Sequence, residues 1–200
     1  MIHLLLKEEK KRKTIYQEMN CLMIKSLLGE RVKEYALSEE EKQKISTYLF
    51  SIEEWGVYQL LLYLNSMATF NVEMILSLSK DLLSRTSFYK VIPKNRRLII
   101  RILLNSITVF LENRNMRYAK YFREIVKELL SNEQEIYEKT VFLFTSGAVD
   151  FYCGEQEVGK TQMLDAIKVF EITGCSNLAQ NYKKDFDEIV KGTSKKSCSS

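Results

Sequence analysis

One stretch of this sequence has the spacing of a nucleotide-binding loop. Two glycines followed by a lysine and a threonine run from Gly154 to Thr161, with an apolar run at Val141–Phe144 before them and a helical pattern after them. In a loop of this kind, backbone amides cradle phosphates while the lysine and the hydroxyl reach the terminal phosphate and its magnesium ion. The chemistry to test first is therefore nucleotide binding or hydrolysis.

The composition of that stretch argues against the chemistry. Glu155 and Glu157 would place two carboxylates beside the phosphates, where negative charge weakens binding. The loop also requires a parallel sheet and a strand ending in an acid that holds magnesium, whereas only helical patterns follow here. We therefore expect Gly154 and Gly159 to mark a turn between two helices.

The remaining residue types offer little else for catalysis or metal binding. The single histidine is His3, and the cysteines form no Cys-x-x-Cys pair; they are Cys21, Cys153, Cys175 and Cys198. Zinc sites need His and Cys at short spacings, and a nucleophilic cysteine or serine needs an activating partner. The sequence predicts no enzyme, no cofactor and no metal, and free thiols in a reducing cytosol.

Composition and charge indicate a helical, cytoplasmic protein. One proline and seven glycines in 200 residues are few for the many tight turns of a sheet-rich fold. The formal net charge of +4 comes from mixed charges, and the basic runs at 10–13 and 195–196 are too short for a nucleic-acid footprint. The apolar runs at 60–64 and 98–104 are shorter than a membrane span, and the opening apolar run is too short for a secretion signal.

Sequence signals mark where helices begin and end. Capping-box patterns open at Ser38, Ser51 and Asn132, while Gly29, Gly174 and Pro93 stand where apolar periodicity stops. Between these marks the apolar residues recur at helical spacing. We predict helices over residues 3–28, 39–50, 52–68, 71–88, 94–112, 115–130, 134–152, 157–173 and 176–190.

The predicted helices form pairs. Helix starts at 52, 94 and 134 lie about 40 residues apart, and each of these helices is followed by a more amphipathic one. This spacing predicts an all-α, tetratricopeptide-like superhelical stack of antiparallel helix pairs, whose concave wall binds extended peptides or partner helices. We expect a connector over 1–37, a repeat domain over 38–191 and a disordered tail over 192–200.

Several segments, in this order and spacing, resemble a known bacterial family. They are Ile52–Leu60 with its Trp55-x-x-Tyr58-Gln59-Leu60 core, Leu103-Leu104-Asn105, Phe144-x-x-Gly147 with Gly154–Gly159, and Ala166-Ile167-x-x-Phe170. From about residue 40 to 190 the chain is similar to the C-terminal domain of the Rgg/GadR/MutR transcriptional regulators of Gram-positive bacteria. The resemblance implies a homodimeric receptor whose helical repeats bind a short signalling peptide imported into the cytosol.

In that family, a helix-turn-helix that binds promoter DNA precedes the repeats. Nothing before residue 38 has that pattern, and residues 3–28 look like the helix that connects the two parts. We therefore expect a fragment or a natural form without the DNA-binding head, which does not bind nucleic acid by itself. The alternative is an interaction adaptor that forms heterodimers with full-length homologues.

A polar stripe on one predicted helix nominates the binding residues. Arg97, Arg101, Asn105, Thr108 and Glu112 recur at helical spacing along an otherwise apolar segment, so they share one face. A shift by the 40-residue period places Asn65 and Thr145 in register with Asn105, and Tyr137 in register with Arg97. The predicted peptide-binding residues are Asn65, Arg97, Arg101, Asn105, Tyr137, Phe144, Thr145 and Tyr152.

The residue types suggest roles for this set. Asparagine amides pair with a peptide backbone, arginines take an acidic side chain or a terminal carboxylate, and aromatic rings form apolar pockets. The alternative for each of these residues is a structural role. A single Asn or Arg in a helix more often stabilises the fold than binds a ligand, and aromatic residues at helical spacing more often lie in the core. We assign Trp55 to packing between helices.

Overall fold

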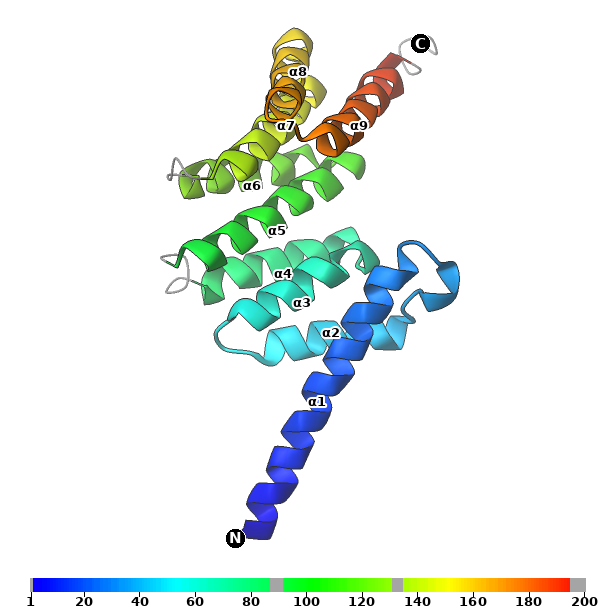
Figure 1. Cartoon of the computed structure of the whole chain (residues 1–200), viewed down its shortest axis with the longest axis vertical. Helices are drawn as coiled ribbons and strands as arrows, with labels where there is room; N and C mark the ends of the chain where they lie inside the picture. The colour runs from blue at the N-terminus through cyan, green and yellow to red at the C-terminus, as the bar shows by residue number, and fades with distance from the viewer. Residues whose placement is uncertain (1, 87–91, 131–134, 195–200) are drawn as a thin grey trace. The chain divides into compact units, whose positions relative to one another are not determined.

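The computed structural model describes residues 2–86, 92–130 and 135–194, with side chains described over 15–86, 92, 94–130 and 135–191. Its helices, shown in Figure 1, are α1 (Ile2–Gly29), α2 (Glu39–Ser51), α3 (Val57–Ser66), α4 (Val72–Arg85), α5 (Pro93–Glu112), α6 (Met116–Leu129), α7 (Ile136–Tyr152), α8 (Gln156–Ile172) and α9 (Ser176–Ser194). Short 3-10 helices cover Lys33–Tyr35 and Met67–Thr69. The described residues contain no strand, so the all-α prediction is confirmed.

Local capping explains several helix boundaries. The Ser38 amide donates to Glu41 Oε2 at 2.8 Å, and the Glu41 amide donates to Ser38 Oγ at 3.3 Å, which completes the predicted capping box. Asn71 Oδ1 accepts from the Met74 amide at 2.9 Å at the start of α4. After α8, Gly174 has a φ of 74°, a left-handed conformation that ends the helix. The predicted cap at Asn132 lies outside the described residues.

The capping box predicted at Ser51 is wrong. Helix α2 continues to Ser51, whose hydroxyl donates to the Tyr48 carbonyl at 2.7 Å, and α3 begins only at Val57. The Gln59 side chain caps α3 by accepting from the Gly56 amide at 3.1 Å. Tertiary contacts decide this boundary, since Trp55 is fully buried and the Arg85 guanidinium donates to the carbonyls of Phe50 and Ile52 at the end of α2.

Two compact units make up the chain, residues 1–102 and 103–200, and α5 contributes to both. In the first unit, α1 packs against α2 and α3, and α2 packs against α4. Trp55 and Tyr63 lie in its core with their ring centroids 5.7 Å apart in an edge-to-face arrangement, and the Tyr63 hydroxyl donates to the Ile75 carbonyl at 3.1 Å. Trp55 therefore packs between helices, as predicted.

An ion pair joins α1 to α2 in the first unit. Lys25 Nζ lies 2.7 Å from both carboxylate oxygens of Glu41, and this hydrogen bond, followed by that of the Ser38 amide, holds the pKa of Glu41 below its usual value. A carboxyl group whose pKa is lower in the folded state than in the unfolded state stabilises the fold at pH values above its unfolded-state pKa. That stabilisation is lost as the pH falls through its folded-state pKa.

We expect Glu41→Gln to remove this pH dependence. Urea unfolding at pH 7 and pH 3 should show a smaller acid-induced loss of stability in the variant, by less than about 1 kcal/mol because solvent screens the pair. Glu40→Gln is the matched control, since Glu40 lies 3.5 Å from Lys44 on the same helix and its carboxylate is well exposed. Equal acid sensitivity of Glu41→Gln and the unmodified chain would contradict the assignment.

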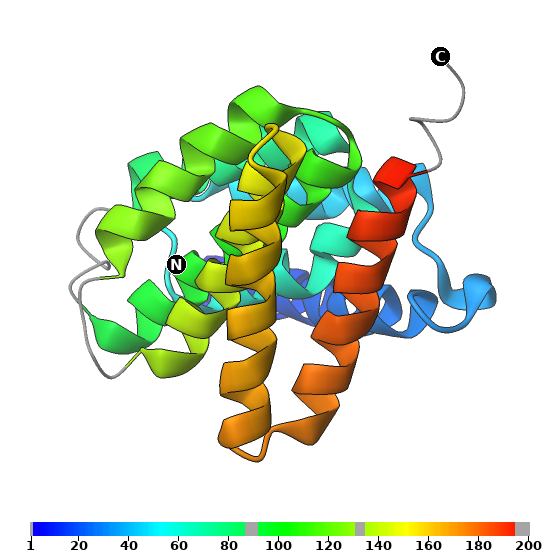
Figure 2. The ribbon, with the colours of Figure 1, turned by 90° about the horizontal axis from the view of Figure 1, so that it is seen from above.

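In the second unit, α7 and α8 approach most closely at two glycines. A Cβ built on Gly159 would lie 2.4 Å from the Gly147 carbonyl oxygen, and one built on Gly147 would lie 2.7 Å from the Gly159 carbonyl oxygen. Helix α9 lies beside α8, joined to it by a short turn (Figure 2). The backbones of α7 and α8 are therefore in direct contact where side chains usually separate helices.

The stretch from Gly154 to Thr161 is a turn followed by a helix. Gly154, with a φ of 107°, lies in the turn after α7, as predicted, whereas Gly159 lies inside α8 and not in the turn. Lys160 Nζ pairs with Glu157 Oε1 at 2.8 Å, and the Thr161 hydroxyl donates to the Glu157 carbonyl at 2.9 Å. The groups that would bind a nucleotide are engaged within one helix.

The paired arrangement is confirmed, but a fixed period is not. Helices α3, α5, α7 and α9 begin at residues 57, 93, 136 and 176, at unequal intervals. Helix α9 runs to Ser194, beyond residue 192 where the predicted tail begins. Residues 195–200, with Cys198 and the terminal lysines, lie outside the described residues. Across the described ranges, no helix has the length and apolar character needed to cross a membrane.

Candidate functional site

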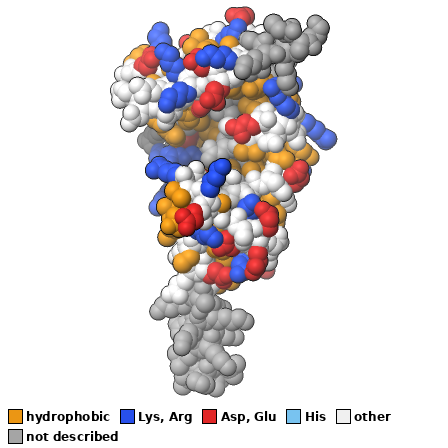
Figure 3. All heavy atoms as spheres, turned by 90° about the vertical axis from the view of Figure 1, so that its right-hand side faces the viewer, with side chains coloured by type: hydrophobic (Ala, Val, Ile, Leu, Met, Phe, Trp, Pro, Cys, Tyr) orange, Lys and Arg blue, Asp and Glu red, His pale blue; other side chains and the backbone are white. Residues whose placement is uncertain are grey.

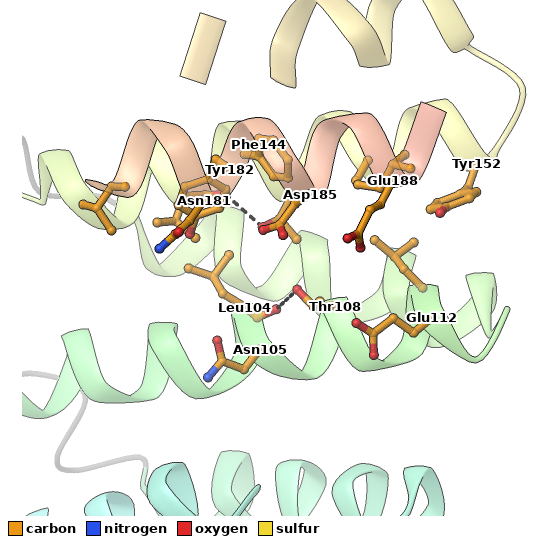
Figure 4. A pocket seen from close by; sticks show the side chains of 16 residues that line it. Leu104, Asn105, Thr108, Glu112, Phe144, Tyr152, Asn181, Tyr182, Asp185 and Glu188 are labelled. Atoms are coloured by element: carbon orange, nitrogen blue, oxygen red, sulfur yellow. Dashed lines mark hydrogen bonds between the residues drawn. The ribbon is translucent and has the colours of Figure 1, made fainter. Parts of the chain in front are cut away.

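A groove of about 500 Å³ lies within the second unit, between α5, α7 and α9 (Figure 4). Its size falls in the range of small-ligand sites. Apolar residues line it together with amides, hydroxyls and carboxylates; the lining residues are Leu104, Asn105, Thr108, Leu111, Glu112, Val141, Phe144, Thr145, Ala148, Tyr152, Leu178, Asn181, Tyr182, Asp185, Glu188 and Ile189. The groove is thus suited to a ligand with both apolar and hydrogen-bonding groups.

Helix α5 presents its polar stripe on one side of this groove. Asn105, Thr108 and Glu112 are exposed and line the groove, while Ile107 and Phe110 between them are buried. The Thr108 hydroxyl donates to the Leu104 carbonyl at 3.3 Å within the helix. The spacing that predicted a solvent-facing stripe is therefore confirmed over this part of α5.

An aromatic column supports the floor. Phe144 of α7 lies 4.8 Å from the Tyr182 ring of α9, and Tyr182 stacks at 5.1 Å on Phe170 of α8. Burial raises the pKa of the Tyr182 hydroxyl. Thr145 is also buried, and its hydroxyl donates to the Val141 carbonyl at 2.9 Å, so it shapes the floor through its methyl group. These contacts fix the walls before any ligand arrives.

Three carboxylates line the groove: Glu112 and Glu188 lie towards one end, and Asp185 lies nearer the middle, above Thr108 (Figure 4). Glu112 projects from α5, and Asp185 and Glu188 project towards it from α9 (Figure 4). Partial desolvation raises the pKa of Glu112, helped by the nearby charge of Asp185, and desolvation followed by the charge of Glu188 raises the pKa of Asp185. This end of the groove therefore carries concentrated negative charge.

A tyrosine closes the acidic end. The Arg114 guanidinium lies 4.9 Å from the centroid of the Tyr152 ring, in a cation–π contact.

The face drawn in Figure 3 shows no such concentration of one charge. Basic and acidic side chains are interspersed with hydrophobic ones over its coloured part. Among the described residues, no group of three His, Cys, Asp or Glu side chains is placed to hold a metal ion.

The structure brings half of the predicted binding residues together in the groove: Asn105, Phe144, Thr145 and Tyr152. Asn65, Arg97 and Arg101 belong to the first unit and do not line it. The Asn65 amide instead points to α1, where its Nδ2 lies 3.6 Å from Met23 Sδ. Tyr137 lies behind the floor, with its ring 6.2 Å from Phe170.

The sequence analysis missed the contribution of α9. Its groove residues are Asn181, Tyr182, Asp185 and Glu188, and the three polar ones are spaced four and three residues apart, like the stripe on α5. That spacing was a usable signal, because it places the three on one helix face. The apolar spacing of residues 176–190 predicted a helix there, and the polar face of that helix was not considered as part of a site.

The paired-helix fold carries a mixed polar and aromatic groove, an arrangement typical of ligand-binding domains. The family model of the HTH-type transcriptional regulator Rgg, C-terminal domain, matches residues 2–184. The chain therefore belongs to the Rgg family of transcriptional regulators. The family resemblance deduced from sequence motifs is confirmed. This is a family of regulators and not of enzymes, in agreement with the prediction.

Solved structures of related proteins share the fold. The Streptococcus dysgalactiae SHP pheromone receptor Rgg2 is 26% identical with a TM-score of 0.78, over 89% of this chain and 66% of that one. A form of that receptor with a cysteine-to-serine change has the same identity and TM-score, over 94% of this chain and 74% of that one. A putative transcriptional regulator from Listeria monocytogenes EGD-e, 18% identical, has a TM-score of 0.79 over 96% of this chain and 68% of that one.

Proposed function

We propose that this chain is the ligand-sensing domain of a transcriptional regulator and that its groove binds a short, partly hydrophobic signalling peptide. The groove between α5, α7 and α9 carries the proposal. The relative described as a pheromone receptor, at 26% identity, supports a peptide as the class of ligand. We propose further that the protein acts in the cytoplasm as a homodimer, as the sequence resemblance implies.

The groove offers complementary contacts to an extended peptide. Asn105 of α5 and Asn181 of α9 lie at the same end of the groove on facing helices (Figure 4), and each side-chain amide both donates and accepts hydrogen bonds. A peptide backbone has the same two functions at every residue. Phe144 and Tyr182 provide apolar surface beneath it. Main-chain pairing and apolar pockets together account for affinity towards a short apolar peptide.

Asn105→Ala is expected to weaken peptide binding about tenfold without unfolding the chain, because a hydrogen-bonding amide is lost from an exposed position. The probe is a synthetic library of leucine- and phenylalanine-rich peptides of roughly eight residues, with affinities of captured members measured by calorimetry. Asn177→Ala is the matched control, since Asn177 is an exposed residue of α9 that does not line the groove.

A steric block gives an independent check of the same site. Thr108 is exposed and projects into the groove from α5 (Figure 4), so Thr108→Trp fills the space without disturbing the core, and binding should be lost. Unchanged affinity in both Asn105→Ala and Thr108→Trp would show that peptides bind elsewhere. The assignment of Asn65, Arg97, Arg101 and Tyr137 to the peptide stays a prediction.

A further inference from the structure

We propose that the acidic end of the groove selects a peptide carrying a lysine or arginine side chain. The inference rests on the proposed function, and it adds the chemical character and orientation of the ligand. The groove has two unlike ends (Figure 4): the amides of Asn105 and Asn181 lie at one, and the carboxylates of Glu112 and Glu188 lie at the other. A bound peptide with one basic side chain therefore has a preferred direction.

The three acids converge because two helices present them to the same space. Asp185 and Glu188 are three residues apart on α9, so they share the face that looks towards α5. Glu112 lies one turn beyond Thr108 on α5 and meets them from the opposite side (Figure 4). An ammonium or guanidinium group placed between the helices would be within reach of carboxylates from both.

No basic residue of the groove lining neutralises these acids. The sixteen lining residues include no lysine, arginine or histidine, and their other ionisable members are Tyr152 and Tyr182. Lys183 and Lys184 are exposed on α9 and do not line the groove. The Arg114 guanidinium lies over the face of the Tyr152 ring. A cation supplied by a ligand would relieve the mutual repulsion of the acids.

The surroundings of the acids favour a long basic side chain over a compact ion. Tyr152 lies at this end of the groove (Figure 4), and Leu111 and Ile189, the sequence neighbours of Glu112 and Glu188, also line the groove and offer apolar surface. Lysine and arginine bury their methylene stems against such surface while the charged head stays among polar groups. The carboxylates are also not among the groups placed to hold a metal ion in the described structure. The groove thus fits a peptide side chain with an apolar stem and a cationic head.

The test uses the whole chain and one peptide library. Its members are N-acetylated and C-amidated, so that basic side chains are the only cations, and each position varies among leucine, phenylalanine, asparagine, lysine and glutamate. The peptides retained by immobilised protein at pH 7 are identified by mass spectrometry. Members with one lysine should be enriched about tenfold over their glutamate counterparts, since about one favourable and one unfavourable charge interaction separate the two.

Removing the acids should remove the preference. In the double variant Asp185→Asn, Glu188→Gln the enrichment of lysine-containing peptides over their glutamate counterparts should fall below about twofold. Asp187→Asn is the matched control, because Asp187 lies on the same helix, pairs with Lys191 at 3.8 Å and does not line the groove. The preference should survive in this control and weaken with added salt.

The possible outcomes separate the two proposals. Retention of uncharged peptides with no lysine preference, or a preference that survives the double variant, would overturn the charge selection and leave peptide binding intact. Retention of no peptide would overturn both. Lowering the pH below neutral should weaken the lysine preference, because Glu112 and Asp185, with raised pKa values, take up protons earlier than ordinary carboxyls while Arg114 stays charged.

Discussion

Gly159→Ala is expected to destabilise the second unit by about 3 kcal/mol, although alanine is the better helix former. The added methyl carbon would lie 2.4 Å from the Gly147 carbonyl oxygen and 2.6 Å from the Phe151 amide nitrogen. Both are backbone atoms of α7, so a side-chain rotation cannot relieve the overlap and the two helices must separate. The propensity gain of about 1 kcal/mol offsets only part of that cost.

The consequence should extend to the groove. Phe144, Thr145 and Ala148 flank Gly147 on α7 and form the floor, so moving α7 away from α8 alters the surface that a ligand contacts. We expect faster amide hydrogen exchange in α7 and α8, a melting temperature lower by roughly 6–12 °C, and weaker peptide binding.

A second glycine provides the control for this substitution. A Cβ on Gly56 would meet only Gln59 Oε1 at 3.5 Å, an ordinary contact, and the φ of Gly56 is −88°. Gly56→Ala should therefore change stability by less than about 0.5 kcal/mol. Equal stability of Gly159→Ala and Gly56→Ala would show that the α7–α8 contact tolerates a side chain.

Arg85→Ala is expected to destabilise the first unit by about 2–4 kcal/mol. The guanidinium donates from Nε to Asp81 Oδ1 at 2.8 Å and from Nη1 to the Phe50 carbonyl at 3.0 Å and to the Ile52 carbonyl. The Asp81 side chain is only 18% exposed. The variant thus removes the partner of a mostly buried charge and leaves carbonyls at the end of α2 without their donor.

Trp55 gives a direct readout of this change. It is the single tryptophan of the chain, it is fully buried, and its amide donates to the Arg85 carbonyl at 3.3 Å. Urea unfolding followed by tryptophan fluorescence should show an earlier transition in Arg85→Ala. Arg85→Lys should recover only part of the loss, because an ammonium cannot reproduce the forked geometry.

A double-mutant cycle identifies the cause. Asp81→Ala combined with Arg85→Ala should destabilise the chain less than the sum of the single variants, since the second change removes the unpaired carboxylate. Additive effects would instead mean that Arg85 acts through packing and its carbonyl contacts alone, and not through the charge of Asp81.

Part of the candidate site could be predicted from sequence, since four of the eight predicted binding residues line the groove. The polar stripe of α5 was visible because helical spacing places Asn105, Thr108 and Glu112 on one face whatever the helix packs against. The contribution of α9 could not be predicted in this way, since Asp185 and Glu112 are far apart in sequence and line one groove only when α9 packs beside α7 and α8. The shift by a fixed period put Asn65 in register with Asn105, whereas the helix intervals are unequal and the Asn65 amide contacts Met23 of α1 in the first unit.

The sequence by itself determined the helices, the ends that local hydrogen bonds set, and the family. Ser38 caps α2 through groups three residues away, and Gly174 ends α8 through its own backbone freedom, so both signals act within one turn. Only the tertiary structure decided that residues 52–56 leave the helix, that Gly159 serves helix packing and that three carboxylates share a groove. Each of these features depends on contacts between separate helices. The energies of such contacts cannot be deduced from the spacing of residues within a single helix.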